Sequence, residues 1–208
     1  IIEDVSNEYI HWKNTSFKER AKVLCDIADQ LDSDLENHAK MISLEIGKPI
    51  IESRMEIKKC VWVLRYFAEN AQIFLKNEKI ITEYKESYIQ YEPIGVILGV
   101  MPWNFPFWQV FRFAIPSLTA GNGAVLKHAS NVQGCANVIE KCFLDAGYYE
   151  NIFSNLSIPG SDVGVVIENT EIAAVTLTGS TPAGIAVAKK AGENLKKTVL
   201  ELGGSDPY

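Results

Sequence analysis

Two polar side chains lie where their chemistry could serve a reaction. Asn104 lies between Pro102 and Pro106, in a turn that the two prolines make rigid. Its side-chain amide could donate a hydrogen bond to a developing oxyanion beside a nucleophile, although an asparagine in a turn is often structural. Glu201 lies in an apolar segment, where loss of water would raise the pKa of its carboxyl toward that of a general base. The alternative is a glutamate that pairs with a cation.

A third candidate, Arg112, is the only charged residue between Glu92 and Lys127. A guanidinium in apolar surroundings needs an anion, because burying an unpaired charge is costly. That anion is either a structural carboxylate or a bound substrate.

A glycine-rich loop offers a place for an anion. Residues Gly179 to Gly184 follow an apolar segment and open a predicted helix, so backbone N–H groups lie beside the hydroxyls of Ser180 and Thr181. The loop is not a Walker loop, because Ile185 and the alanine after it replace the required Lys-Ser/Thr pair. By itself, the loop fits a tight turn as well as a phosphate site.

The elements that must position these residues follow from apolar patterning. Fully buried strands are predicted at residues 94–100, 123–127, 172–178 and 198–202. Helical patterns alternate with them at 107–120, 132–146 and 182–193. This alternation predicts a parallel α/β sheet, whose ligands bind at the carboxyl ends of the strands.

The first 90 residues have a different character. Apolar residues at helical spacing predict one or two helices over 16–47, with Ser16 and Glu19 as a capping box, and another long helix over 50–76. Residues 79–90 place β-forming side chains among charges, which indicates an exposed strand pair or arm.

Composition excludes several classes of protein. The chain has 208 residues, a net charge of −6 and 47% hydrophobic residues, which is enough for a sizeable core and argues against disorder and nucleic-acid binding. Residues 93–111 are uncharged, but Pro102 and Pro106 would break a membrane-spanning helix, so no membrane span is expected. The chain lacks an initiator Met and ends just after Gly203 and Gly204, which indicates a fragment.

The cysteines do not indicate a metal site. They lack paired C-x-x-C spacing, so we expect buried thiols, no bound metal, and a reducing, cytoplasmic location. They are Cys25, Cys60, Cys135 and Cys142.

Together, these motifs resemble the N-terminal part of the aldehyde dehydrogenase superfamily. Pro-Trp-Asn-Phe-Pro at 102–106, Lys127, Thr-Gly-Ser-Thr at 178–181 and Glu-Leu-Gly-Gly at 201–204 occur in the family's order and at its approximate spacing. Pro-Ile-Gly-Val at 93–96 and Gly-Lys-Pro at 47–49 add to the match. Within the family, residues 101–106, 108–112 and 126–129 resemble the succinate-semialdehyde dehydrogenases.

This resemblance implies a fold and a domain plan. The fold class is α/β, a Rossmann-like parallel sheet with flanking helices, preceded by N-terminal helices and a β arm. Residues 1–78 would form the helical part of the cofactor-binding domain, 79–92 the arm of an oligomerisation element, and 93–208 the NAD(P)-binding core. The catalytic domain would lie outside the chain, and the full-length protein would be a homo-oligomer.

The resemblance also implies roles for single residues. Asn104 would stabilise the oxyanion when a thiolate attacks an aldehyde, and Glu201 would activate the water that releases the acid. Arg112 would bind the distal carboxylate of a semialdehyde substrate. The cofactor, NADP or NAD, would be held by Pro102, Trp103, Lys127, Ser130, Gly160, Gly164, Gly179, Ser180 and Leu202.

Two departures from the family pattern matter. Ser130 occupies a position where the family often has a glutamate that binds both ribose hydroxyls, which removes a charge that would repel a 2′-phosphate and makes NADP at least as plausible as NAD. The nucleophilic cysteine of the family lies beyond the Glu201 motif, where this chain has ended. We therefore expect the fragment alone to be inactive, either as part of an aldehyde dehydrogenase or as a truncated nucleotide-binding module.

Overall fold

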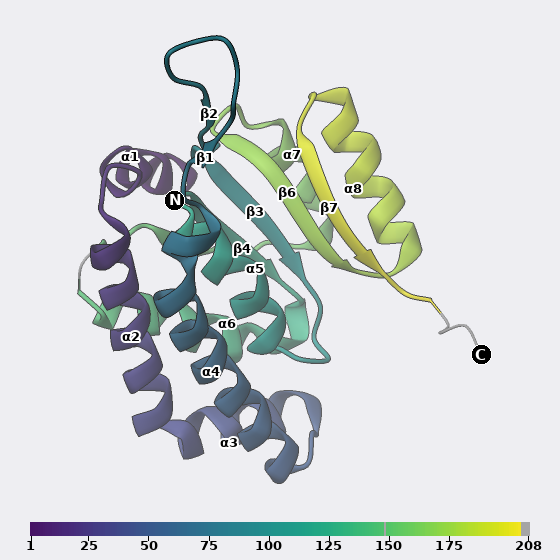
Figure 1. Ribbon diagram of the computed structural model, residues 1–208. Coiled ribbons are helices and arrows are strands. Elements are labelled where there is room, and N and C mark those ends of the chain that lie inside the picture. Colours follow the sequence, from purple (N-terminus) through teal and green to yellow (C-terminus); the bar gives the residue numbers. More distant parts are fainter. Residues whose placement is uncertain (148, 205–208) are drawn as a thin grey trace.

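A parallel sheet forms the centre of the protein in a computed structural model, which describes residues 1–147 and 149–204 (Figure 1). Among these residues, five strands pair in the order β5-β4-β3-β6-β7. The strands are β3 (Val96–Met101), β4 (Gly123–His128), β5 (Phe153–Asn155), β6 (Ile172–Gly179) and β7 (Lys197–Leu202). Every pair in this sheet is parallel, which confirms the predicted α/β class. The end of the predicted core, residues 205–208, lies outside the described residues.

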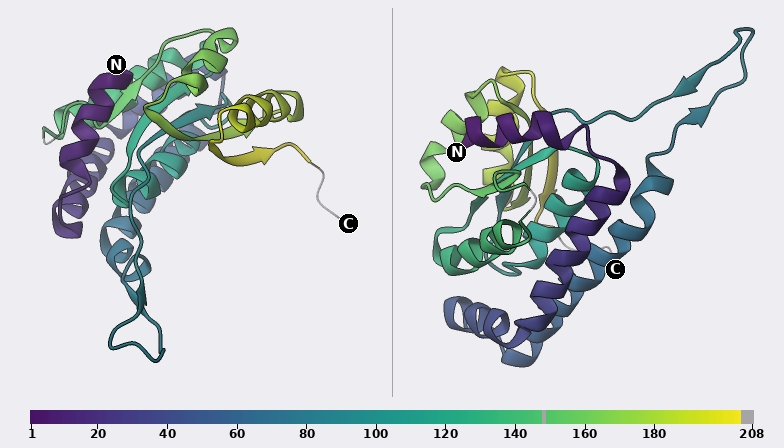
Figure 2. Two further views of the ribbon diagram at one scale, coloured as in Figure 1. Left: turned by 90° about the horizontal axis from the view of Figure 1, so that it is seen from above. Right: turned by 90° about the vertical axis from the view of Figure 1, so that its left-hand side faces the viewer.

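Helices cover both faces of the sheet (Figures 1 and 2). One face is covered by two helices that follow strands, with three N-terminal helices packed around them, and the other by three helices. The first set is α5 (Trp108–Thr119) and α6 (Gln133–Asp145), with α2 (Phe17–Ser33), α3 (Leu35–Ile46) and α4 (Ile50–Phe74). The second set is α1 (Ile2–Trp12), α7 (Val163–Glu168) and α8 (Thr181–Glu193). Two hydrophobic cores result, one on each side of the sheet.

Close packing between β3 and α5 depends on one glycine. At Gly99, in the middle of β3, a Cβ atom would lie 2.2 Å from Cζ of Phe113. The missing side chain lets the aromatic ring of α5 lie directly on the strand. This contact fixes the distance between the sheet and the helix that carries Arg112.

The N-terminal helices form as predicted. Ser16 begins α2 with both hydrogen bonds of a capping box, because its hydroxyl accepts from the Glu19 N–H at 3.2 Å and its own N–H donates to the Glu19 carboxylate at 2.7 Å. The prediction over 16–47 divides into α2 and α3, and α4 corresponds to the predicted 50–76 helix. α1 was not predicted, and its Trp12 indole donates to the Leu118 carbonyl at 2.8 Å.

A two-stranded arm extends from the body of the protein (Figure 2). It contains the antiparallel strands β1 (Glu78–Lys79) and β2 (Tyr88–Ile89). Large apolar side chains on it are exposed, including Ile81 at 96% and Tyr84 at 73%. No helix in the described part of the chain is long and apolar enough to cross a membrane.

The prediction of four fully buried strands is wrong for β7. β3, β4 and β6 are largely buried, whereas nearly all of β7 is exposed. β7 is the last strand of the sheet and pairs only with β6. An edge strand has a neighbour on one side only, so its apolar composition does not bury it.

Candidate functional site

The predicted site residues gather at one edge of the sheet, where the parallel strands end. The turn of residues 102–106 follows β3, Ser130 follows β4, Ser180 follows β6, and Leu202 is the last residue of β7. Gly160 and Gly164 lie apart from these ends, in a short 3-10 helix (residues 160–162) and in α7. The α/β topology therefore brings most of the predicted residues to one edge.

Asn104 is exposed, in the bend between β3 and α5. Trp103 and Phe105 beside it are also exposed, whereas Pro106 is buried. The Phe105 carbonyl accepts a hydrogen bond from the Gln109 N–H at 3.0 Å. The side chain that could donate to an oxyanion thus lies on an accessible turn with a buried end.

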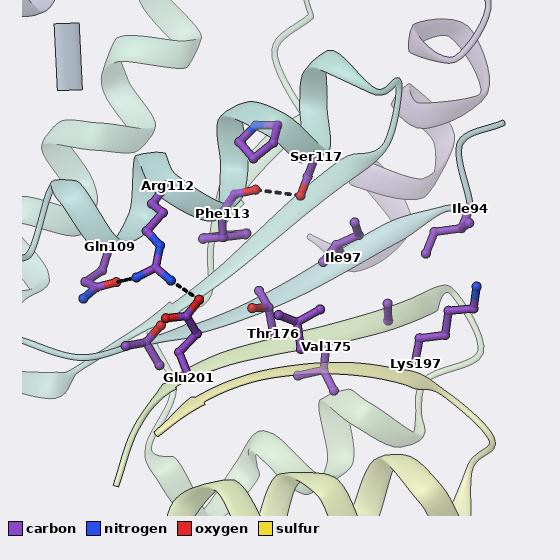
Figure 3. Close-up of a pocket in the computed structure, with 14 residues that line it drawn as sticks. Ile94, Ile97, Gln109, Arg112, Phe113, Ser117, Val175, Thr176, Lys197 and Glu201 are labelled. Carbon is purple, nitrogen blue, oxygen red and sulfur yellow. Dashed lines mark hydrogen bonds and ion pairs between the residues drawn. The ribbon is translucent and has the colours of Figure 1, made fainter. Parts of the chain in front are cut away.

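Arg112 and Glu201 form an ion pair across a cavity of about 340 Å³ (Figure 3). The cavity lies between α5 and the face of β3, β6 and β7, and most of its lining is apolar. Arg112 Nη1 also lies 3.5 Å from the Gln109 side-chain oxygen. In this chain the anion that faces Arg112 is the Glu201 carboxylate, and the cation that faces Glu201 is the Arg112 guanidinium.

The expectation that Glu201 is desolvated is wrong. Its side chain is 48% exposed and that of Arg112 is 36% exposed. The carboxylate lies on the edge strand β7, where water reaches it. Apolar neighbours in the sequence therefore did not give this carboxylate an apolar environment.

Lys127 lies near the carboxyl end of β4 and is only 9% exposed. Burial lowers the pKa of its ammonium group. Within residues 1–147 and 149–204, no hydrogen bond or ion pair satisfies this ammonium. A largely buried cation without a protein partner fits a residue that donates to hydroxyl groups of a ligand.

The loop at Gly179 and Ser180 opens helix α8. The Ser180 hydroxyl accepts from the Ala183 N–H at 3.4 Å, so Ser180 is the N-cap of the helix. Gly184 in this helix faces Leu202, whose Cδ2 would lie 2.5 Å from a Cβ atom on the glycine. The glycine therefore brings α8 close to the end of β7 and leaves its first N–H groups at the strand ends.

Three functional candidates were missed by the sequence analysis. The carboxylate of Glu56 and the ammonium of Lys48 form a buried ion pair at 2.5 Å, and the ring of His128 is fully buried. The signal for Glu56 was available, because it shares the buried face of α4 with Cys60 and Leu64. A carboxylate on an apolar helical stripe needs a partner.

Comparison with known proteins identifies the family of the chain. The sequence profile of the aldehyde dehydrogenase family matches residues 1–208. The chain belongs to the aldehyde dehydrogenase family.

Individual relatives in this family cover almost all of the chain. The probable NADP(+) succinate-semialdehyde dehydrogenase of Synechocystis sp. is 47% identical over 95% of this chain, and the succinate semialdehyde dehydrogenase [NAD(P)+] of Escherichia coli is 46% identical over 95%. The match covers 43% of each relative. The chain thus spans less than half the length of these relatives.

A solved structure of an aldehyde dehydrogenase family member has the same fold. The succinic semialdehyde dehydrogenase of Streptococcus pyogenes, crystallised with NADP+, superposes with a TM-score of 0.95 at 36% identity. The match covers 99% of this chain and 45% of that chain.

The cysteines of this family member are unlike nucleophiles. Cys60, Cys135 and Cys142 are buried, and Cys25 is partly exposed, so the expectation of buried thiols holds for three of them. Burial raises the pKa of the Cys142 thiol to about 12 and raises those of the other three as well. Each thiol is therefore protonated at neutral pH. The described residues contain no cluster of side chains that could hold a metal ion.

Proposed function

We propose that the full-length protein oxidises an aldehyde, succinate semialdehyde, to the carboxylic acid with NADP or NAD. The observation that carries this proposal is the ion pair of Arg112 and Glu201, which lies near the carboxyl end of β7 in a cavity along the sheet face. Arg112 holds a carboxylate there, as it would hold the distal carboxylate of the substrate. The names of the relatives support the same substrate.

The chemistry divides between this chain and a cysteine outside it. When the cysteine thiolate attacks the aldehyde carbon, the side-chain amide of Asn104 donates to the oxygen that gains negative charge. When bound, the cofactor would accept the hydride that leaves the same carbon, and the loss of hydride would leave a thioester. Glu201 then takes a proton from water, the water oxygen attacks the thioester carbon, and the cysteine leaves as a thiolate.

Several observations support a dinucleotide at this edge. The buried ammonium of Lys127 fits ribose hydroxyls, and the N-terminus of α8 at Gly179 and Ser180 fits a pyrophosphate. We propose that Pro102, Trp103 and Leu202 border the cofactor, with Gly160 and Gly164 on its adenine side. Ser130 is uncharged and would not repel the 2′-phosphate of NADP, so this position supports binding of NADP as well as NAD.

We also propose that the arm pairs with a second copy of the protein. Its exposed apolar side chains, such as Ile81 and Tyr84, have no cover in a single chain. The native mass of the full-length protein tests this, and a monomer would contradict it.

The experiment that tests the function uses the full-length protein with succinate semialdehyde and either NADP or NAD. We expect one NADPH or NADH to form for each aldehyde molecule that is consumed. Comparing kcat/KM for NADP with kcat/KM for NAD shows which cofactor the enzyme prefers. If the protein binds the nucleotide but oxidises no aldehyde, the proposal is refuted, and the alternative of a truncated nucleotide-binding module is supported.

A further inference from the structure

Buried polar groups from distant parts of the sequence hold the α5 end of the turn that carries Asn104. The turn of residues 102–106 joins the end of β3 to the start of α5. Its hydrogen-bond partners come from α4 and from the end of β4. Neither partner is needed for the roles proposed above.

Glu56 of α4 caps the helix that follows the turn. Its Oε1 accepts from the N–H groups of Phe107 and Trp108, at 2.8 and 3.0 Å. These N–H groups open α5 and have no acceptor within the helix, and a carboxylate also complements the helix dipole. The first turn of α5, directly after the Asn104 turn, is thus fixed to α4.

Lys48 holds Glu56 in place. Its Nζ lies 2.5 Å from Oε2 of Glu56, and the two side chains are only 8% and 1% exposed. The same Nζ lies 3.7 Å from the ring centroid of Phe105, the residue after Asn104. One buried cation therefore contacts both the carboxylate that caps α5 and the turn itself.

His128 holds the turn from the opposite side. Its Nε2 lies 2.9 Å from the Pro106 carbonyl, and its Nδ1 lies 3.2 Å from the carbonyl of Met101, the last residue before the turn. The Ala129 N–H donates to Nδ1 at 3.0 Å, which places the ring proton on Nε2 and makes Nε2 the donor to Pro106. Burial lowers the pKa of His128 and so favours this neutral ring.

Stability does not account for this arrangement. A buried ion pair is often no more stabilising than well-packed apolar side chains of the same volume, because both charges must leave water. An oxyanion donor, however, must be held accurately, since a displacement of about 1 Å can cost on the order of 100-fold in rate. Fixed contacts at the α5 end of a five-residue turn with two prolines supply that accuracy.

We propose that Glu56, held by Lys48, and His128 are positioning residues that set the place of the Asn104 amide. The proposal rests on the proposed function, because it requires Asn104 to stabilise an oxyanion. Glu56 and His128 act through the backbone of the turn and do not touch the substrate.

A double-mutant cycle in the full-length enzyme tests the proposal. The rate of NADPH formation in a single turnover is measured for the wild type, Glu56→Ala, Asn104→Ala and the double variant. We expect Glu56→Ala to lower this rate by about 10- to 100-fold, because it misplaces the oxyanion donor. Asn104→Ala removes that donor and should cost more, about 100- to 1,000-fold. In the Asn104→Ala background, Glu56→Ala should have almost no further effect.

Two further variants separate positioning from stability. Glu56→Gln keeps an oxygen that accepts from Phe107 and Trp108, so it should recover most of the rate. Glu45→Ala is the matched control, because the Glu45 carboxylate accepts from the Gly134 and Cys135 N–H groups at 2.7 and 2.9 Å at the start of α6. It should lower Tm as Glu56→Ala does and leave the single-turnover rate unchanged.

The possible results are distinct. If the effects of Glu56→Ala and Asn104→Ala multiply, or if Glu45→Ala slows the reaction equally, the positioning role is refuted. If Glu56→Ala does not fold, His128→Gln and His128→Phe enter the same cycle, and only the first keeps a donor for the Pro106 carbonyl. The cycle uses whichever aldehyde the wild type oxidises, so a wrong substrate assignment refutes the proposed function and leaves this test intact.

Discussion

Arg112 offers the sharpest test of substrate choice. Replacing it with leucine in the full-length enzyme removes the guanidinium but keeps a shorter, apolar side chain on α5. We expect Arg112→Leu to lower kcat/KM for succinate semialdehyde and to leave kcat/KM for butanal, a neutral aldehyde with the same number of carbon atoms, nearly unchanged. The reason is that only the first substrate has a carboxylate for Arg112 to bind.

The size of the effect follows from the exposure of the ion pair. A hydrogen bond to a charged group contributes about 1.5–3 kcal/mol where water is excluded. The Arg112 side chain is 36% exposed and already pairs with Glu201, so the lower end of this range applies. About 1.5 kcal/mol corresponds to a roughly tenfold change in the ratio of the two kcat/KM values.

The assay is chosen so that Glu201 does not obscure the result. When hydride transfer is the first irreversible step, kcat/KM does not include the later hydrolysis in which Glu201 acts. Lys197→Leu is the matched control, because Lys197 lines the same cavity at the end away from Arg112 (Figure 3). An unchanged ratio in Arg112→Leu, or an equal fall in Lys197→Leu, would show that Arg112 does not recognise the carboxylate.

Three further predictions concern cofactor binding and stability. Lys127→Met should raise the Kd for NADP and NAD by about tenfold, because a buried donor to the ligand is lost, and nucleotide titration measures this. Gly99→Ala should lower the free energy of unfolding, measured in urea, by about 1–3 kcal/mol, because the added Cβ atom would clash with the Phe113 ring. Gly192→Ala is the control and should not destabilise the protein, because a Cβ atom added there has no neighbouring atom within 4 Å. Burial lowers the pKa of His38 in the folded protein. As the pH falls below about 6.5, the unfolded chain therefore binds a proton at this side chain more readily than the folded chain does. Stability should therefore fall from pH 7 to pH 5, by at most about 1.4 kcal/mol per pH unit from this group, and His38→Gln should reduce that slope in urea titrations.

The elements that the sequence predicted are those with long or repeated patterns. α2, α3 and α4 have apolar residues at helical spacing over many turns, and β3, β4 and β6 are continuous apolar runs. α1 was missed although Ile2, Val5, Tyr9 and Trp12 lie on it at helical spacing and pack against the cores. β5 has three residues, fewer than a strand pattern needs.

The sequence indicated candidate site residues where the residues next to them in the chain form a recognisable pattern. Asn104 lies between two prolines, and Lys127 lies near the end of a buried strand, so local patterns found both. Glu56 and His128 bond to backbone atoms at the end of a turn far from them in the sequence, and Lys48 pairs with Glu56. Their contacts form only when α4 and β4 pack against the same turn, and no local pattern contains that information.

Glu201 shows where reasoning from composition fails. Its neighbours in β7, Val199, Leu200 and Leu202, are apolar, and the sequence therefore predicted burial for this strand as it did for β3. β3 has paired strands on both sides and helices on both faces, whereas β7 has one paired strand, and Val199 beside Glu201 is 61% exposed. The apolar residues of a strand set how much apolar surface it could bury. The strands and helices that pack against the strand decide how much of that surface is buried. For Glu201, the informative observation is therefore its ion pair with Arg112.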